Sequence, residues 1–216
     1  MKLITAITSL LALAFTPSAI AHAGTANKQA LKYNYEFSIC PDVPAMRFTL
    51  TWDDQVGDII INVLEKRTGK LIQQITAEGV EEPYQGPAVF TAEDINYDGC
   101  QDLKLLCFTG ATGNELYRYW TYNRKTNKFQ SEKILEDICN PEIRLSKKEI
   151  FSHCKEGGAG AYYIETTYKF TGKKYKLIRQ TDQYLELESG RVIREEKEVR
   201  NGRMITIKKE EIIKNN

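Results

Sequence analysis

The amino-acid sequence predicts an all-β protein built from antiparallel sheets. Short runs of β-branched and aromatic residues recur about every ten residues, and each ends at a turn signal rich in Gly, Asn or Asp. No helical period is sustained, and even the charged run Arg194–Glu198 has flanking residues that break such a period, so we expect a solvated strand there. The spacing of the strands fits a sandwich, a barrel or a propeller. Since the sequence has no repeat of fixed length, all three architectures stay open.

The charge balance narrows the possible functions. The 216 residues include 30 Lys and Arg and 29 Asp and Glu, which gives a net charge of +1. A nucleic-acid-binding protein would show a basic excess, so we expect no nucleic-acid partner. Only two histidines occur, His22 and His153, which weakens schemes that need a histidine pair or a nucleophile–histidine relay. We therefore expect a protein that is not an enzyme.

The N-terminus has the pattern of a secretory signal peptide. Lys2 is followed by an apolar stretch, Leu3–Phe15, and by a small-residue cleavage site at Ala19–Ala21, with Ala21–Ala23 as a second choice. An uncleaved N-terminal anchor is the alternative, but the stretch is shorter than the ~20 residues that span a bilayer. We expect residues 1–21 to be removed and the mature chain to be periplasmic or secreted, with no membrane span.

The rest of the chain is expected to be a polar lead-in, residues 22–45, followed by a single all-β domain, residues 46–216. A loop rich in Gly and Pro is expected at 78–87, and hairpin turns at Thr171–Lys173 and Asn201–Gly202. The main expected strands cover residues 47–52, 58–66, 71–75, 102–108, 114–122, 128–130, 161–170 and 174–179.

Export makes disulfides the default state of the cysteines. The five residues Cys40, Cys100, Cys107, Cys139 and Cys154 allow at most two bridges, and spacing alone leaves all the pairings open. We favour Cys139–Cys154, because the residues between them predict a short strand–turn–strand excursion. A zinc site has no C-x-x-C motif to support it. A reactive cysteine beside His153 is weaker still, because adjacent strand residues point to opposite faces.

One motif in the chain has the residue types and spacing of a metal-binding loop. The segment Asp94–Asp102 fits D-x-N-x-D-G-x-x-D, the spacing of an EF-hand-like calcium loop. Alternate oxygens can curl around a hard cation, and Gly99 permits the sharp turn. The predicted Ca²⁺ ligands are the side chains of Asp94, Asn96 and Asp98, the carbonyl of Cys100, and Asp102 directly or through water.

The loop departs from a complete EF-hand in one respect. The twelfth position, which should be a bidentate Glu, is Leu105, and the residues after Asp102 predict a strand. The missing ligand would come from water, from Glu93 or from the 111–115 loop. The alternative is an acidic Asx-type turn without metal. We favour the metal, because crowded carboxylates without a cation would repel one another.

The predicted aromatic strand at 114–122 suggests a binding surface in addition to the calcium loop. Tyr117 and Tyr119 share one face, and Leu116, Trp120 and Tyr122 share the other. We expect one face to enter the core and the other to be open to a protein or glycan. The run Gly157–Gly160 lacks the Lys and helix of a phosphate-binding loop, so it is expected to be a loop at a protein-binding tip.

These pieces together resemble small exported calcium-binding β-propeller proteins with FG-GAP-like repeats, typified by the lysozyme-inhibiting immunity protein of the Xanthomonas type IV secretion system. The resemblance covers about residues 85–180. The matching segments are Val89–Leu103, Asn114–Tyr122, Phe129, Asn140–Ile143, Ile150–Ser152, Gly157–Gly160 and Tyr168–Ile178.

The resemblance implies a propeller-like arrangement of sheets stiffened by Ca²⁺ and a function in protein binding. The expected partner is another exported protein such as a peptidoglycan hydrolase, inhibited when a rigid loop fills its cleft. The alternative from a different class is a glycan-binding or structural protein of the envelope.

Overall fold

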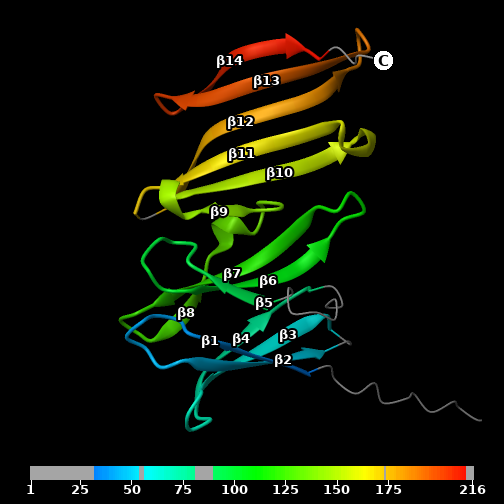
Figure 1. The fold of residues 1–216 in the computed structure, drawn as a ribbon. Coiled ribbons are helices and arrows are strands. Elements are labelled where there is room, and N and C mark those ends of the chain that lie inside the picture. The colour runs from blue at the N-terminus through cyan, green and yellow to red at the C-terminus, as the bar shows by residue number, and fades with distance from the viewer. Residues whose placement is uncertain (1–31, 54–55, 81–89, 173, 213–216) are drawn as a thin grey trace, which may run out of the picture.

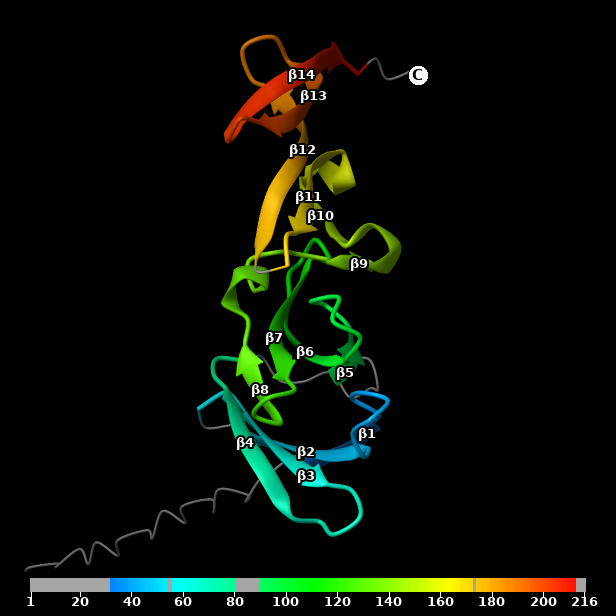
Figure 2. The ribbon, with the colours of Figure 1, turned by 90° about the vertical axis from the view of Figure 1, so that its left-hand side faces the viewer.

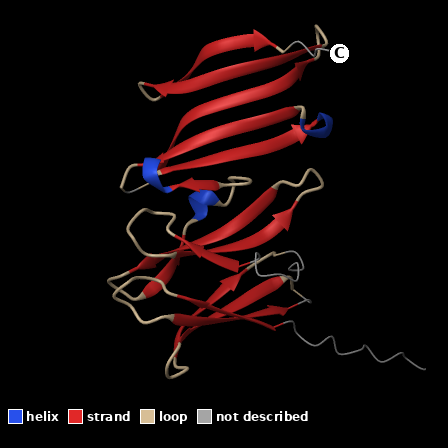
Figure 3. Ribbon diagram, viewed as in Figure 1, coloured by secondary structure: helices blue, strands red, loops and turns tan. Residues whose placement is uncertain are grey.

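A computed structural model describes residues 32–53, 56–80, 90–172 and 174–212. These residues form antiparallel strands with three single-turn 3-10 helices between them, as Figure 3 shows. The strands make three meanders, here named the N-terminal, middle and C-terminal sheets, which follow one another along the molecule (Figure 1). Among the described residues, no helix has the length and apolar character needed to cross a bilayer. The all-β prediction is confirmed.

The N-terminal sheet has the strand order β1-β2-β3-β4. In β3 every second residue is buried, namely Ile59, Ile61 and Val63, which is the pattern of a strand with one face in a core. The strands are β1 (Lys32–Phe37), β2 (Met46–Asp53), β3 (Asp58–Glu65) and β4 (Leu71–Ala77).

The middle sheet, in the order β5-β6-β7-β8, packs face to face on the N-terminal sheet. Phe48 of the N-terminal sheet meets Phe90 and Phe129 of the middle sheet, with ring centroids 5.6 and 5.9 Å away. This shared apolar core holds the two sheets together. The strands are β5 (Phe90–Glu93), β6 (Asp102–Thr109), β7 (Glu115–Asn123) and β8 (Lys128–Ser131).

The C-terminal sheet is mostly a single layer. A second small core, which includes Tyr119, Ile150 and Tyr175, joins its inner end to the middle sheet. Farther out, Figures 1 and 2 show no second layer over β12, β13 and β14 in the described part of the chain. The strands are β9 (Glu142–Arg144), β10 (Glu149–Gly157), β11 (Tyr162–Phe170), β12 (Tyr175–Glu186), β13 (Arg191–Arg200) and β14 (Arg203–Glu211), in the sheet order β14-β13-β12-β11-β10-β9.

Helical segments are short and lie only in the connections of this part of the chain. They add no layer to any of the sheets, as Figure 3 shows. They are η2 (Lys133–Leu135), η3 (Leu145–Lys147) and η4 (Gly158–Gly160).

The structure corrects the expected arrangement of the sheets. The N-terminal and middle sheets have the four-stranded meander of a propeller blade, but the three sheets are stacked, and the described residues form no closed ring (Figures 1 and 2). The reason lies in the packing: two sheets share a face-to-face core, while most of the third buries little. The charged run Arg194–Glu198 lies within β13, as predicted.

The expected polar lead-in is also corrected in part. Lys32–Phe37 forms β1, and its aromatic residues pack against the first core. Cys40 is buried and disulfide-bonded. The domain therefore begins before residue 46. The expected signal peptide, residues 1–21, and the rest of the lead-in up to residue 31 lie outside the described residues.

Two disulfides are present, Cys40–Cys100 and Cys139–Cys154. The second is the bridge favoured from sequence. It joins the connection between β8 and β9 to strand β10 of the C-terminal sheet. Cys107 is unpaired and buried in the first core.

Candidate calcium loop

The segment Asp94–Gln101 connects β5 to β6, two neighbouring strands of the middle sheet. The ladder between them ends at the pair Glu93 and Asp102, so the loop leaves and re-enters the sheet at one point. Tyr97 and Gly99 have φ values of 61° and 86°, which are left-handed conformations that fold the chain back on itself. A Cβ at Gly99 would meet nothing within 4 Å, so glycine is favoured there by backbone conformation and not by space.

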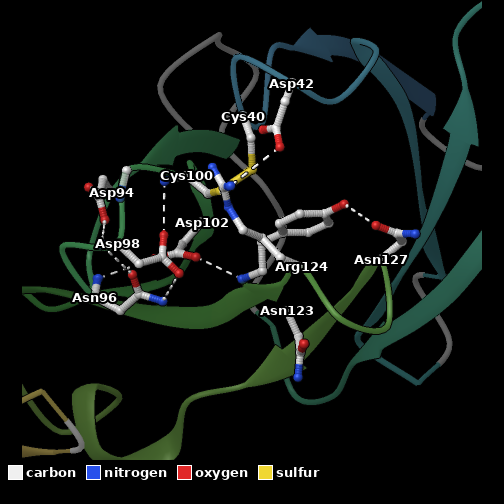
Figure 4. Close-up of a disulfide and its surroundings, with 12 residues drawn as sticks. Cys40, Asp42, Asp94, Asn96, Asp98, Cys100, Asp102, Asn123, Arg124 and Asn127 are labelled. Atoms are coloured by element: carbon white, nitrogen blue, oxygen red, sulfur yellow. Dashed lines mark hydrogen bonds and ion pairs between the residues drawn. A yellow bond between two sulfur atoms is a disulfide. The ribbon is translucent and has the colours of Figure 1, made fainter.

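The polar side chains of the loop turn inward onto its own backbone (Figure 4). Asp94 accepts hydrogen bonds from the N–H groups of Asp98 and Gly99 at 3.1 and 3.0 Å. Asn96 Oδ1 accepts from the Asp98 N–H at 3.0 Å, and Asp98 Oδ1 accepts from the Cys100 N–H at 2.9 Å. These Asx-type bonds hold the oxygen atoms at alternate positions in one small region.

Asp102 is the fully buried member of the motif. Its Oδ2 accepts from the N–H groups of Ile95 and Asn96 at 3.0 and 3.3 Å, and its Oδ1 accepts from the Tyr122 N–H at 2.7 Å. Burial raises its pKa to about 7, and the three backbone hydrogen bonds oppose that rise. Asp102 therefore fixes the start of the loop against β7.

On one side the loop is tied to the connection between β1 and β2 of the N-terminal sheet. Cys100 forms the disulfide with Cys40, and the Gln101 N–H donates to the Ile39 carbonyl at 2.6 Å. Arg124 Nε lies 2.9 Å from Cys100 Sγ, and its Nη1 lies 3.3 Å from Asp42 Oδ2, so the guanidinium covers the disulfide (Figure 4).

On the other side the loop is tied to the C-terminal sheet. The Tyr97 hydroxyl donates to the Glu149 carbonyl of β10 at 2.8 Å, and the Tyr97 ring packs on Phe170 at 5.7 Å between centroids. In return, the Tyr175 hydroxyl of β12 donates to the Ile95 carbonyl. Because the loop connects two strands of the middle sheet, it links all three sheets of the described chain, reaching the N-terminal sheet through the β1–β2 connection.

The donor set of the loop fits a hard cation. Asp94 and Asp98 supply carboxylates, Asn96 an amide oxygen and Cys100 a backbone carbonyl, all of which are ligand types that Ca²⁺ prefers. Across the described ranges, no three His, Cys, Asp or Glu side chains form a group that could hold a metal. A cation here would therefore depend on the amide, the carbonyl and water in addition to the two carboxylates.

One of the expected extra ligands has another partner. Glu93 Oε1 lies 3.0 Å from Lys104 Nζ on the neighbouring strand. In the 111–115 loop, Glu115 accepts a hydrogen bond from the Tyr117 hydroxyl. Neither contact adds an acidic ligand to the loop, so water is the natural source of the remaining oxygens.

Comparison with known proteins gives one fold relationship. No protein-family model matches the chain, and no curated protein matches it. Among solved structures, it is similar to one described as a Xanthomonas type IV secretion system related protein, with a TM-score of 0.54 and 12% sequence identity. The match covers 82% of this chain and 99% of that chain. The similarity shows a shared fold.

The two disulfides are consistent with an exported protein. The match extends well beyond the Asp94–Asp102 loop, because it covers 82% of this chain.

The aromatic strand β7 does not provide the expected open surface. Tyr119 is fully buried in the second core, and Tyr117 packs against the same core beneath Lys104, whose Nζ is 4.2 Å from the ring centroid. Trp120 and Tyr122 are buried in the first core. Both faces of β7 contribute to cores, so the strand does not present the open aromatic face that the sequence predicts.

Proposed function

We propose that this protein is an exported binding module, stabilised by calcium, whose partner is another exported protein. The contact of the Asp94–Asp102 loop with all three sheets carries this proposal. A cation bound there would hold the ends of the loop and, through them, the relative positions of the sheets. Rigidity of this kind lowers the entropy that a binding protein loses when it docks.

The calcium ligands we propose are the side chains of Asp94, Asn96 and Asp98 and the carbonyl of Cys100, completed by water. Asp102 supports them by holding the Ile95 and Asn96 N–H groups, and a bridging water would link it to the ion. The role of the ion is structural, and it would neutralise two carboxylates that otherwise lie close together.

We propose that the protein acts by binding and not by catalysis. His153 makes a 3.1 Å contact with Glu165 and stacks on Tyr163 with 4.8 Å between ring centroids. Its neighbour Cys154, the nucleophile that the sequence places beside it, is held in a disulfide. This environment supports a structural role for His153.

The partner class we propose is a peptidoglycan hydrolase, inhibited sterically. The proposal rests on the sequence resemblance of residues 85–180 and on the fold shared with a secretion-system-related protein. The glycan-binding alternative lacks support from β7, since Tyr119 is buried and Tyr117 packs against the second core.

The test combines the purified mature protein with a panel of peptidoglycan hydrolases of different cleavage classes, in calcium and in chelator. We expect a complex with at least one of them in size-exclusion chromatography, and slower clearing of a cell-wall suspension by that enzyme. Calcium should strengthen the complex. The absence of any complex or inhibition across the panel, with the protein shown to be folded, would reject the hydrolase as partner.

A further inference from the structure

One face of the C-terminal sheet carries a cleft over β11, β12 and β13, near the turn η4 that connects β10 to β11 (Figure 3). Its volume is about 430 Å³, which lies in the range of small-ligand pockets. Tyr163 of β11 pairs with Gln183 of β12, so Tyr162 and Tyr184, one position farther along each strand, are neighbours on the same face. The residues that line this tyrosine cleft include Glu156, Tyr162, Asp182, Tyr184, Glu195 and Lys197.

The turn η4 positions the Tyr162 ring. Gly158 has a φ of +58°, and a Cβ there would lie 2.7 Å from Cε2 of Tyr162. Glycine at this position therefore lets the ring lie directly against the backbone of the turn. The Gln183 Nε2 group donates a hydrogen bond to the Ala161 carbonyl at 2.8 Å, which fastens the end of the turn to β12. The glycine run thus supports an aromatic ring that is only partly buried.

The charged side chains in and beside the cleft neutralise one another. Lys197 Nζ lies 2.5 Å from Asp182 Oδ2 and 3.3 Å from Glu195 Oε2. Glu195 also pairs with Lys209 at 3.0 Å and accepts a hydrogen bond from the Tyr184 hydroxyl at 3.1 Å. Hydrogen bonding to Lys209 lowers the pKa of Glu195, and hydrogen bonding to Asp182 raises the pKa of Lys197, so both groups are charged at neutral pH. The two acids and two lysines form a balanced network that also holds the Tyr184 hydroxyl.

Glu156 adds a single acid at the rim. It is the extra residue of a bulge between β10 and β11, because Lys155 pairs with Tyr163 and Gly157 pairs with Tyr162. Its side chain is exposed and makes no ion pair with any described residue. The cleft therefore combines two tyrosine rings, a neutral network of charged groups and one open carboxylate.

We propose that the tyrosine cleft binds a neutral saccharide. The C–H face of a sugar ring is apolar and packs on an aromatic ring, for which Tyr162 and Tyr184 are available. Each sugar hydroxyl both donates and accepts a hydrogen bond, as other hydroxyl groups do. Such groups can bond to Asp182, Glu195 and Lys197 without separating the charges that these residues already pair.

Charged ligands fit the cleft less well. An anion would have to break the contacts of Lys197 with Asp182 and Glu195, and it would also meet the Glu156 carboxylate. A cation would gain only Glu156, and an ion pair with so exposed a group contributes little. The site shares no residue with the calcium loop, so the proposal depends neither on calcium nor on a hydrolase as partner.

NMR titration of the parent mature protein tests the proposal. The neutral probes are chitotetraose, cellotetraose and maltotetraose, and the charged probes are tetralysine and tetragalacturonate. We expect at least one neutral probe to bind with a Kd of roughly 0.1 to 10 mM, a weak affinity, and to shift the amide signals of η4 and of the facing parts of β11 and β12. The charged probes should bind at least about tenfold more weakly.

Two pairs of variants test the tyrosine rings. Tyr184→Ala should weaken binding at least about fivefold, whereas Leu185→Ala, the next residue on the opposite face of β12, should leave the Kd unchanged. Gly158→Ala should also weaken binding, because the new Cβ displaces the Tyr162 ring. Its control is Gly160→Ala, where φ is +87° and a Cβ meets nothing within 4 Å. Both glycine variants strain a left-handed backbone, so a difference between them reports on Tyr162.

The mapping on the parent protein needs no variant to fold. Absence of binding by every neutral probe, stronger binding of a charged probe, or amide shifts that fall outside the cleft would overturn the proposal. Equal affinities of the folded Gly158→Ala and Gly160→Ala proteins, or a Tyr184→Ala protein that binds like the parent, would do the same.

Discussion

The Tyr97 hydroxyl lies 2.8 Å from the carbonyl oxygen of Glu149 and donates a hydrogen bond to it. Tyr97 belongs to the candidate calcium loop, and Glu149 begins the first long strand of the C-terminal sheet. The bond and the return bond from Tyr175 to Ile95 are direct polar links between the loop and that sheet. The loop is thus bonded directly to the C-terminal sheet, so substitutions in the loop should change the stability of that sheet.

Tyr97→Phe tests this hydrogen bond. The substitution keeps the ring on Phe170 and removes only the hydroxyl, so the Glu149 carbonyl loses one partner. We expect the free energy of unfolding to fall by about 1 kcal/mol, measured by denaturant titration, with little change in calcium affinity. Tyr184→Phe is the control, because its hydroxyl bonds to the side chain of Glu195 on the outer part of the same sheet. Equal losses in the two variants would argue against a special role for the Tyr97 bond.

Asp94→Ala and Asp98→Ala test the calcium proposal. In the parent protein, millimolar calcium should raise the melting temperature above its value in chelator, because a ligand that binds only the folded state stabilises it. Each variant should lose that increment. The control is Asp137→Ala, which changes an exposed acid outside the loop and should keep the rise in melting temperature that calcium gives. Identical melting of the parent in calcium and in chelator would show that no stabilising ion binds.

The two disulfides should differ in their contribution to stability. Cys40 and Cys100 are 60 residues apart, and Cys139 and Cys154 are 15 apart. In the chain-entropy model these loops correspond to about 4 and about 3 kcal/mol. We expect the double Ser variant at 40 and 100 to lose more unfolding free energy than the one at 139 and 154, measured by chemical denaturation. The reverse order would show that local packing at Cys139–Cys154 outweighs loop length.

Asp102 should make stability depend on pH. Burial raises its pKa to about 7 in the folded protein, whereas an unfolded aspartate titrates near ~4. Between these values the folded state holds more protons than the unfolded state, so the unfolding free energy should fall as pH rises from about 4 to about 7. This stabilising contribution is complete below about pH 4 and absent above about pH 7.

The measurement is made in chelator, by comparing the parent with Asp102→Asn. The amide does not titrate, so the parent should lose stability relative to the variant across this pH range. A constant difference between the two proteins from pH 4 to pH 8 would contradict the assignment.

Local patterns predicted the strands well. The alternation of apolar residues predicted β3, and the turn signal at Asn201–Gly202 predicted the β13–β14 hairpin. The broken helical period of Arg194–Glu198 correctly indicated a strand. The first strand was missed, although Tyr33, Tyr35 and Phe37 alternate with polar residues in the same way. The polar character of the surrounding segment obscured that short signal.

Contacts between distant segments could not be predicted in this way. Cys40 and Cys100 are brought together by the packing of two sheets, and no local pattern encodes that packing. The exposure of β7 depends on what covers each face, so alternation identified the two faces but not the two cores. Asp94, Asn96 and Asp98 lie close together, and their role as calcium ligands stays a prediction. The buried hydrogen bonds of Asp102 follow from where the loop re-enters the sheet.

The single-layer part of the C-terminal sheet has a consequence for how this protein can change over evolution. Within the described residues its outer strands share no interior with a second layer, so the gain or loss of a terminal hairpin there would leave the packing of the other two sheets intact. A change in the length of this sheet would leave the first core unchanged, whereas the N-terminal and middle sheets share that core and must change together.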